Sequence, residues 1–564
     1  MVYHLRRASI GLVCLATLVF LLWLLPRILN PTPPTPEERK RDQRWVDSSP
    51  YWLDRQACRL LGLCGIHHVK WDAPALPEKG GNDDGGDLRL ELLERLALGW
   101  SEERHFVAKT GTDSWETAPV QDLRRRRIGA AQSGRAKILE EIPDYVLAHA
   151  PLVHLYSGEN FWPADMAEHI RHMEPLLADG LLVNASEPLE LGDLGQLNAQ
   201  NSTVYLTSKD DVESRPEWLH SHIGIPVPFD DDERRGAGDS DGERGLDEHW
   251  GWRDDTRKPS EGTTWWDVDK EHPPHRIADP QKLSDRQRDR QRDRQRRQRQ
   301  SRAFRESQQH PLVGGFQEDE KPNNHSSGYS DGPAVLVLVD KGAGILDAFW
   351  FFFYSYNLGQ TVLSIRFGNH VGDWEHCMVR FEHGIPRAMF LSEHAGGKAY
   401  AWQALEKRAA RDKNKPARPV IYSAVGSHAM YASSGNHPYV LPFGMLADQT
   451  DKGPLWDPAL NHYAYWYDYE RDREGADTTE PRSLTPAASN PKAPTSWFHF
   501  EGYWGEDIYP LSDKRQWRLF GQYHYVTGPL GPKFKNLDRQ KVCQTEKCTI
   551  LYSIEAGKKS TWYS

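Results

Sequence analysis

The chain has 564 residues, enough for two or three domains, and 27% of them are charged while 11% are aromatic. This composition is compatible with folded segments that carry a hydrophobic core. Its 80 acidic and 70 basic residues leave a formal net charge of -10 at pH 7. Nucleic-acid-binding domains usually carry a basic face, so the overall charge argues against a general role in nucleic-acid binding and predicts no nucleic acid among the partners.

The first segment, residues 1–30, predicts a cytoplasmic tail and a signal-anchor transmembrane helix. Arg6 and Arg7 precede an unbroken apolar run from Ala8 to Pro26, which at about 1.5 Å of rise per residue approaches the roughly 30 Å thickness of the bilayer core. A removed signal peptide is the alternative, but no clear small-residue cleavage site follows the run. The short basic tail would stay in the cytoplasm. We therefore expect a single-pass type II protein of the endomembrane system, in the vacuole or the secretory pathway, with its soluble part in the lumen.

Cysteine and asparagine patterns agree with a lumenal location. The soluble part contains two close cysteine pairs, in which an oxidising lumen would allow local disulfides; they are Cys58 with Cys64 and Cys543 with Cys548. Zinc binding is the alternative, but neither pair has the Cys-x-x-Cys spacing that it would need. Three tripeptides predict N-glycosylation of a secretory-pathway glycoprotein; their asparagines are Asn184, Asn201 and Asn324.

Changes in composition divide the rest of the chain. Residues 31–140 begin with a proline-rich polar stretch, Pro31–Arg44, that predicts a stiff stalk, and then give no clear pattern. Residues 141–207 form a first folded segment, in which Asp165 is expected to cap a short helix. Residues 208–332 are rich in Asp, Arg, Gln, Gly and Ser. They predict a disordered insertion, because so few apolar side chains cannot offset an ordering entropy of about 1–2 kcal/mol per residue.

Residues 333–545 predict the main folded domain, followed by a C-terminal tail at residues 546–564. Short runs rich in Val, Phe, Tyr and Trp, such as AVLVLVD and FWFFFYSYN, are separated by turn residues. This pattern is typical of a β-sandwich or a related β-rich domain. One segment, residues 401–413 (AWQALEKRAARDK), has a helical pattern instead. The predicted fold class is therefore mainly β with some α.

One stretch of this domain, His370-Val-Gly-Asp-Trp-Glu-His376, combines two imidazoles with two carboxylates. On a strand, alternation would place Asp373 and Glu375 on one face and Trp374 and His376 on the other. Two carboxylates that face a core need a cation, a basic side chain or a shared proton. With His370 able to close on the same point, the stretch predicts a calcium or magnesium site with His370, Asp373 and Glu375 as ligands. The alternative is a polar turn whose carboxylates accept hydrogen bonds or pair with an arginine.

Two later segments are expected to add second contributors to this site. Glu393 and His394 precede a glycine pair, and His428 follows Gly426 and Ser427. Loops at the rim of a sandwich gather such side chains, and binding sites concentrate there. A metal-dependent hydrolase is one alternative. A serine hydrolase is not expected, because neighbouring Ser427 and His428 would point apart on a strand and no Gly-x-Ser-x-Gly is present.

A series of segments resembles, in order, the fungal vacuolar protein sorting-associated protein 62 family. Among them are DKGAGILDAFWFFFYSYNLG, FGNHVGDWEHCMVRF, SEHAGGKAYAW and TDKGPLWDP. The resemblance covers roughly residues 142–210 and 333–545. It implies a single-pass membrane protein with a role in delivering proteins to the vacuole, and it implies no known activity. We expect a binding domain for a lipid, a glycan or a cargo protein; a structural scaffold without a metal site is a further alternative.

The same stretch has a weaker local similarity to necrosis-inducing secreted proteins. Their heptapeptide Gly-His-Arg-His-Asp-Trp-Glu is similar to the segment around His370, Asp373 and Glu375, with Gly372 at the place of the second histidine. In that family, acidic and imidazole side chains of a β-sandwich surround a divalent cation at a membrane-glycolipid site. The similarity implies that His370, Asp373 and Glu375 act as ligands here, while the upstream acid of that family has no secure counterpart.

Overall fold

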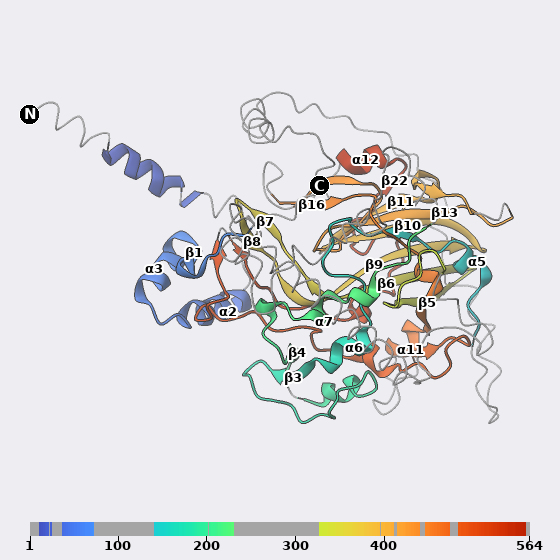
Figure 1. Ribbon diagram of the computed structural model, residues 1–564, viewed down its shortest axis with the longest axis horizontal. Helices are drawn as coiled ribbons and strands as arrows, with labels where there is room; N and C mark the ends of the chain where they lie inside the picture. Colours follow the sequence, from blue (N-terminus) through green and yellow to red (C-terminus); the bar gives the residue numbers. More distant parts are fainter. Residues whose placement is uncertain are drawn as a thin grey trace, which may run out of the picture.

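The computed structural model describes residues 11–21, 23–24, 36–72, 140–200, 202–229, 326–394, 396–410, 414–439, 446–473, 483–519 and 521–559. These residues form mainly β structure with short helices (Figure 1). The predicted class, mainly β with some α, is confirmed.

An eight-stranded sheet lies at the centre, with the strand order β19-β18-β5-β6-β9-β10-β11-β22. Its middle consists of β5 (Ala334–Gly342), β6 (Ile345–Asn357), β9 (His370–Glu382) and β10 (Ile385–Glu393), each antiparallel to the next. Every residue of β6 after Ile345 is buried. A strand that is covered on both faces has a nearly continuous apolar sequence. This explains why FWFFFYSYN shows no alternation of apolar and polar residues.

The outer strands of this sheet come from distant parts of the chain. On one side lie β18 (His462–Tyr467), parallel to β5, and β19 (Leu484–Pro486). On the other side lie β11 (Gly396–Ala401) and β22 (Ile550–Leu551), which leads into α12 (Ile554–Lys559). Both elements belong to the predicted C-terminal tail, residues 546–564, and β22 joins part of this tail to the central sheet.

A five-stranded sheet covers one face of the central sheet. Trp350 and Phe352 of the central sheet share a hydrophobic core with Val153 and Ile421 of the second sheet. Two sheets that bury facing side chains in this way form a sandwich, as predicted. The strands of the second sheet are β2 (Leu152–His154), β12 (Lys407–Arg408), β13 (Arg418–Ser423), β14 (Met430–Tyr431) and β17 (Leu455–Trp456).

Short elements and aromatic loops cover the opposite face. Trp374 of β9 lies among the rings of Trp497 and Trp504, with centroid distances of 6.0 and 5.3 Å. Asp165 accepts a hydrogen bond from the Ala167 amide at 2.9 Å, which confirms the predicted helix cap. The elements on this side include α6 (Met166–Arg171), β3 (Met173–Leu177), β4 (Val204–Ser208), η3 (Leu194–Ala199) and η12 (Ser496–His499).

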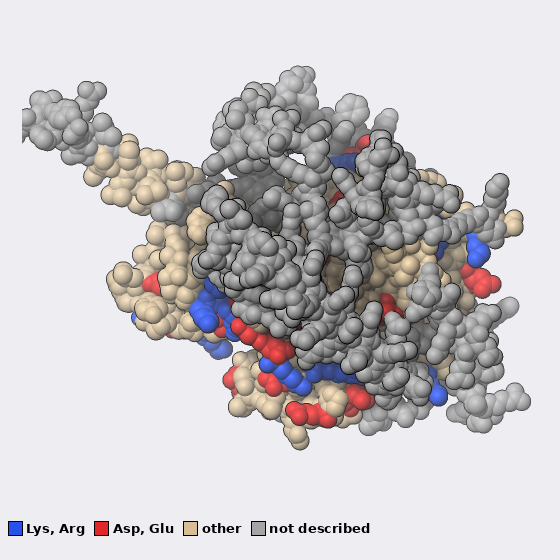
Figure 2. Space-filling model, viewed as in Figure 1, with Lys and Arg blue, Asp and Glu red and all other residues tan. Residues whose placement is uncertain are grey.

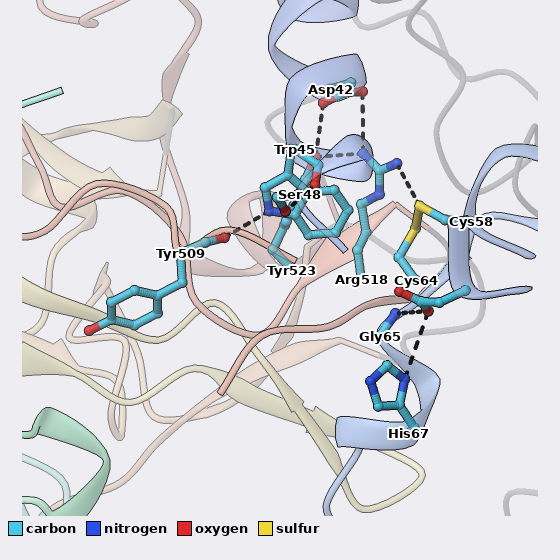
Figure 3. Close-up of a disulfide and its surroundings, with 11 residues drawn as sticks. Asp42, Trp45, Ser48, Cys58, Cys64, Gly65, His67, Tyr509, Arg518 and Tyr523 are labelled. Atoms are coloured by element: carbon cyan, nitrogen blue, oxygen red, sulfur yellow. Dashed lines mark hydrogen bonds and ion pairs between the residues drawn. A yellow bond between two sulfur atoms is a disulfide. The ribbon is translucent and has the colours of Figure 1, made fainter. Parts of the chain in front are cut away.

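An N-terminal lobe packs against the end of the domain (Figure 3). It contains α2 (Pro36–Asp47), α3 (Trp52–Leu61) and β1 (Leu63–Cys64), which pairs with β20 (Arg518–Leu519) and through it with β21 (Gln522–Tyr523). Trp45 donates to the Tyr509 carbonyl at 2.8 Å and lies 4.9 Å from the Arg518 guanidinium. The stalk prediction is therefore wrong over residues 36–44. Proline suits the first position of a helix, and the buried Trp45 fixes this helix to the domain.

Two further boundaries differ from the prediction. Residues 208–229 and 326–332 are ordered, with α7 (Glu217–His220) and η5 (His222–Gly224) in the first part and Ser330 donating to the Gly224 carbonyl at 2.7 Å in the second. The predicted disordered insertion is thus wrong at both ends, and its remainder, residues 230–325, lies outside the described residues. The predicted helix at 401–413 is wrong as well: it contains η9 (Trp402–Ala404) and β12. Pairing of Lys407 and Arg408 with β13 overrides the local helical pattern.

The predicted membrane anchor falls only partly within the described chain, where residues 11–21 and 23–24 are helical. Among the described residues, no helix is both long and apolar enough to span a bilayer. The rest of residues 8–26 lies outside them, so the anchor stays a prediction.

Acidic and basic side chains lie next to one another along the lower edge of the face in Figure 2. Ion pairs of this kind include Arg171 with Glu168 at 3.1 Å and Arg515 with Asp211 at 3.3 Å. Exposed pairs of this kind contribute little to the stability of the fold.

The buried imidazole of His462 on β18 predicts a loss of stability in acid. Burial lowers the pKa of His462 from 6.5 to about 4. The unfolded chain would take up this proton below about pH 6.5 and the folded chain only near pH 4, so the free energy of unfolding should fall as the pH falls between these values. Urea unfolding at pH 7 and 4.5 should show about 2–3 kcal/mol less acid destabilisation in His462→Met than in the wild type. His172→Met controls for the substitution, and equal acid destabilisation in wild type and His462→Met would contradict the prediction.

Candidate functional site

Polar side chains meet at one end of the sandwich, between the central sheet and the turn that joins β13 to β14. They come from β9, β10, that turn, β16 (Ala447–Thr450) and the loop after β2. We call them the polar cluster; its members are Glu159, Asp373, Glu375, Ser392, Glu393, His394, Ser427, His428, Tyr431 and Asp448. The structure thus brings together all the predicted site residues except His370.

His428 lies at the centre of one half of the polar cluster. Its Nδ1 donates to Asp373 at 2.9 Å, its Nε2 donates to the Phe161 carbonyl at 3.1 Å, and its ring stacks on Tyr354 at 3.7 Å. Burial acts to lower the pKa of His428, but the hydrogen bond to Asp373 and the nearby carboxylates outweigh burial and raise it. Since both ring nitrogens donate, the ring is held as a buried cation. It compensates the charge of Asp373.

The turn that carries His428 is held by Glu159. One carboxylate oxygen of Glu159 accepts from the Gly426 amide at 2.8 Å, and the same oxygen lies 3.8 Å from His428. Gly426 has a φ of +70°, and a Cβ at this position would lie 2.4 Å from the Leu358 carbonyl oxygen, so only glycine fits. The second oxygen of Glu159 accepts from the Phe161 amide at 2.9 Å. A single carboxylate thereby joins segments that are far apart in the sequence.

Glu375 avoids charge repulsion with Asp373 by protonation and not by an ion pair. Burial and the charge of Asp373 raise its pKa to about 8, so Glu375 holds a proton at neutral pH. It forms a hydrogen bond with Ser392, whose hydroxyl also accepts from the His376 amide at 2.9 Å. The sequence analysis offered a cation, a basic side chain or a proton as the means of neutralising these two carboxylates. In the structure, a basic side chain neutralises Asp373 and a proton neutralises Glu375.

Asp448 organises the other half of the polar cluster. It accepts from Ser427 at 2.7 Å, from Tyr431 at 2.8 Å and from His394 at 2.7 Å. Burial acts to raise the pKa of Asp448, but the charge of His394 and the hydrogen bonds from His394, Ser427 and Tyr431 together outweigh burial and lower it. Conversely, Asp448 outweighs the effect of burial and raises the pKa of His394 to about 9. The two residues therefore form an ion pair at neutral pH.

Glu393 completes this half at the end of β10. Burial raises the pKa of its carboxyl to about 7, although Lys398 opposes this from 3.5 Å. Ser427 donates to Asp448 and not to an imidazole. This geometry does not generate a serine nucleophile, which needs a base on its hydroxyl.

His370 does not join the polar cluster. Its Nδ1 donates to the Gly372 carbonyl at 2.7 Å, and burial lowers its pKa. Within the described ranges, no group of three or more His, Cys, Asp or Glu side chains is arranged to hold a metal ion. Asp373 and Glu375 are bonded to His428 and Ser392, and the predicted calcium or magnesium site stays a prediction.

Sequence reasoning missed Glu159 and Ser392 and gave Asp448 no place in the site. Glu159 lies 267 residues before the Gly426 amide that it binds, and a single sequence carries no signal for such a distant pairing. Ser392 stands directly before the predicted Glu393, but its contacts with Glu375 and the His376 amide form only in the folded sheet.

The described residues include both predicted disulfides and one of the three predicted glycosylation sites. Disulfides join Cys58 to Cys64 (Figure 3) and Cys543 to Cys548. Asn184 is exposed, while Asn201 and Asn324 lie outside the described residues.

Replacing Asp448 by asparagine should destabilise the fold. The amide cannot accept all three hydrogen bonds, and His394 would lose its buried counter-charge. Removal of one partner of a buried pair typically costs about 3–5 kcal/mol, and we expect a decrease near the lower value in urea unfolding at pH 7. Glu546→Gln, at an exposed acid, is the control. A loss below about 1 kcal/mol, the size of an ordinary hydrogen bond, would show that the polar cluster does not depend on Asp448.

A family model and two similar proteins point to the same family. Residues 341–442 match the family described as vacuolar protein sorting-associated protein 62. Two proteins of Saccharomyces cerevisiae are similar over 72% of this chain and 68% of their own length: "Putative vacuolar protein sorting-associated protein TDA6" at 32% identity and "Vacuolar protein sorting-associated protein 62" at 30%. A solved structure described as "Toxin fold for microbial attack and plant defense" is 14% identical over 25% of this chain and 59% of that chain, with a TM-score of 0.14, too low to inform the fold. On the strength of the two yeast proteins, the chain belongs to the vacuolar protein sorting-associated protein 62 family.

Proposed function

We propose that the protein takes part in vacuolar protein sorting as a binding component and not as a catalyst. The observation that carries this proposal is its similarity to two yeast proteins named for vacuolar protein sorting, which extends over 72% of the chain. At this coverage the similarity extends well beyond a single motif.

The geometry of the polar cluster supports a binding role. A catalytic acid, base or nucleophile must face a substrate. His428 is instead held between Asp373 and a backbone carbonyl, and Asp448 accepts hydrogen bonds from Ser427, Tyr431 and His394. These bonds fix the β13 to β14 turn and β16 on the central sheet. The polar cluster therefore acts as a brace that holds the neighbouring surface loops in one arrangement, as a preformed binding surface requires.

We further propose that the folded domain lies in the lumen, close to the membrane. The two disulfides and the exposed Asn184 agree with a lumenal location. Near the predicted anchor, α3 exposes large apolar side chains, with Trp52, Leu53 and Leu60 being 62%, 74% and 73% exposed. Aromatic and aliphatic side chains of this kind suit the interface of a bilayer.

Complementation in yeast tests the sorting role. In a Saccharomyces cerevisiae strain without the two relatives, we expect part of a vacuolar hydrolase to be secreted, and expression of this chain should restore its retention. Asp448→Asn should restore less, because it loosens the brace, while Glu546→Gln should act like the wild type; immunoblots would correct for protein amount. Normal retention in the deletion strain, or no restoration by the wild-type chain, would contradict the proposal.

Metal analysis tests the alternative of a divalent-cation site. An ion bound by Asp373 and Glu375 would have to displace the imidazolium of His428 and the proton of Glu375. We therefore expect equal calcium and magnesium contents in the purified wild-type chain and in an Asp373→Asn/Glu375→Gln variant, measured by mass spectrometry of the elements. Stoichiometric metal in the wild type that is lost from a folded variant would instead establish the cation site and reopen metal-dependent hydrolysis.

A further inference from the structure

Arg539 is a buried cation on the face of the central sheet opposite the polar cluster. It follows η13 (Pro532–Phe534) and precedes the Cys543–Cys548 disulfide, and it is 5% exposed. Its guanidinium carbon lies 4.9 Å from the ring centroid of Phe349 and 4.6 Å from that of Phe390. The rings provide a favourable cation–π environment, but they accept no ordinary hydrogen bond.

One edge of this guanidinium is unused. Nε and Nη2 of Arg539 are buried and have no hydrogen-bond partner among the described residues, while Nη1 reaches the Lys535 carbonyl at 3.5 Å. Nε and Nη2 together form the edge with which an arginine binds both oxygens of a carboxylate. Arg380 uses this same edge on Asp347, with both bonds at 2.8 Å. Asp347 is thus engaged, and Arg539 presents an equivalent edge to no carboxylate of the described chain.

The charge of Arg539 is also poorly compensated. Burial lowers its pKa to about 9; the attraction of Asp347 opposes this shift, and the repulsion of Arg380 adds to it. A guanidinium nevertheless stays protonated in proteins near neutral pH. A buried charge without a partner is strongly unfavourable, so this position favours the entry of an anion.

His376 of β9 adds a second unsatisfied group beside the same rings. It is fully buried, and neither of its ring nitrogens has a hydrogen-bond partner in the part of the chain that the structure describes. Its ring lies 6.3 Å from Phe349 and 5.5 Å from Phe390, the two rings that Arg539 contacts. Burial and the charge of Arg539 hold the pKa of His376 well below its usual value. The neutral ring therefore offers one N–H donor.

We propose that Arg539 and His376 form a binding site for a compact oxyanion with the chemistry of inorganic phosphate. Two oxygens of the anion would accept from Nε and Nη2 of Arg539, and the imidazole N–H of His376 would donate to a further oxygen. The phenyl rings of Phe349 and Phe390 exclude water and so strengthen these charge-assisted bonds. A water molecule would satisfy the hydrogen bonds but not the charge. The small exposed fraction of Arg539 favours a free anion over a bulky phosphorylated molecule.

Calorimetric titration of the full chain with sodium phosphate in Tris chloride at pH 7 tests the site. Anions released from a denatured sample and separated by ion chromatography would detect a copurified ligand. We expect one phosphate per wild-type chain, and binding weakened about 100-fold in Arg539→Gln, which removes a charge-assisted bidentate contact. His376→Phe should weaken binding by about 3- to 10-fold, the value of one hydrogen bond. The matched control is Arg471→Gln, on the exposed surface of α11 (Tyr469–Arg473).

Arg539→Lys keeps the charge without the two-donor edge and serves as a second variant if Arg539→Gln does not fold. It should bind phosphate at least about 10-fold more weakly than the wild type. Phosphate should also raise the melting temperature of the wild type and of Arg471→Gln, but not that of Arg539→Gln or Arg539→Lys. A wild-type chain that neither copurifies with an anion nor binds phosphate at millimolar concentration would overturn the proposal. Equal binding in the wild type and in the Arg539 variants would overturn it as well.

Discussion

The antiparallel pairing of β6 with β9 is the constraint on which the rest of the molecule depends. It runs from Ile345 opposite Glu382 to Asn357 opposite His370, through the middle of a sheet that is covered on both faces. Side chains of a strand alternate between faces, so β9 sends Asp373 and Glu375 toward the five-stranded sheet and His376 toward the aromatic loops. A slip of one residue would exchange these sets and bury every charge against the wrong partners. The register therefore fixes both the polar cluster and the Arg539 site.

A sheet with two buried faces must neutralise each charge that it carries, and this chain does so locally in three ways. Asp373 has the imidazolium of His428, Glu375 keeps a proton, and Asp347 binds Arg380 through two parallel hydrogen bonds. Each solution follows from the high free energy of an unpaired charge in a low-dielectric interior. Arg539 departs from this rule, because its open edge meets no acceptor among the residues that the structure describes. The contrast with Arg380, which lies near it and uses the same edge, separates a structural arginine from one that is available to a ligand.

The features that the sequence predicted correctly depend on residues close together along the chain. The alternation in β9 is confirmed, since Cys377 and Val379 lie in one core and Trp374 and Met378 in the other. The Asp165 cap depends on residues two positions apart and was equally predictable. The polar cluster was predicted only in part, because Glu159 reaches Gly426 through tertiary folding alone. Residues 401–413 show the opposite failure: their helical pattern yields to sheet pairing of Lys407 and Arg408, a tertiary effect that propensity does not contain.

The region that matches the family, residues 341–442, spans the chain from the end of β5 to beyond β15 (Gly435–Pro438). It contains β6, β9 and β10 and the histidines of both sites, His376 and His428, but Glu159 lies before it, and Asp448 and Arg539 lie after it. The matched region alone would therefore leave His394 without its counter-charge and the Gly426 amide without its acceptor. The flanking segments are integral to the folded domain. On one face of the sheet Glu159 and Asp448 bond to the β13 to β14 turn, and on the other Arg539 packs on Phe349 of β6 and Phe390 of β10.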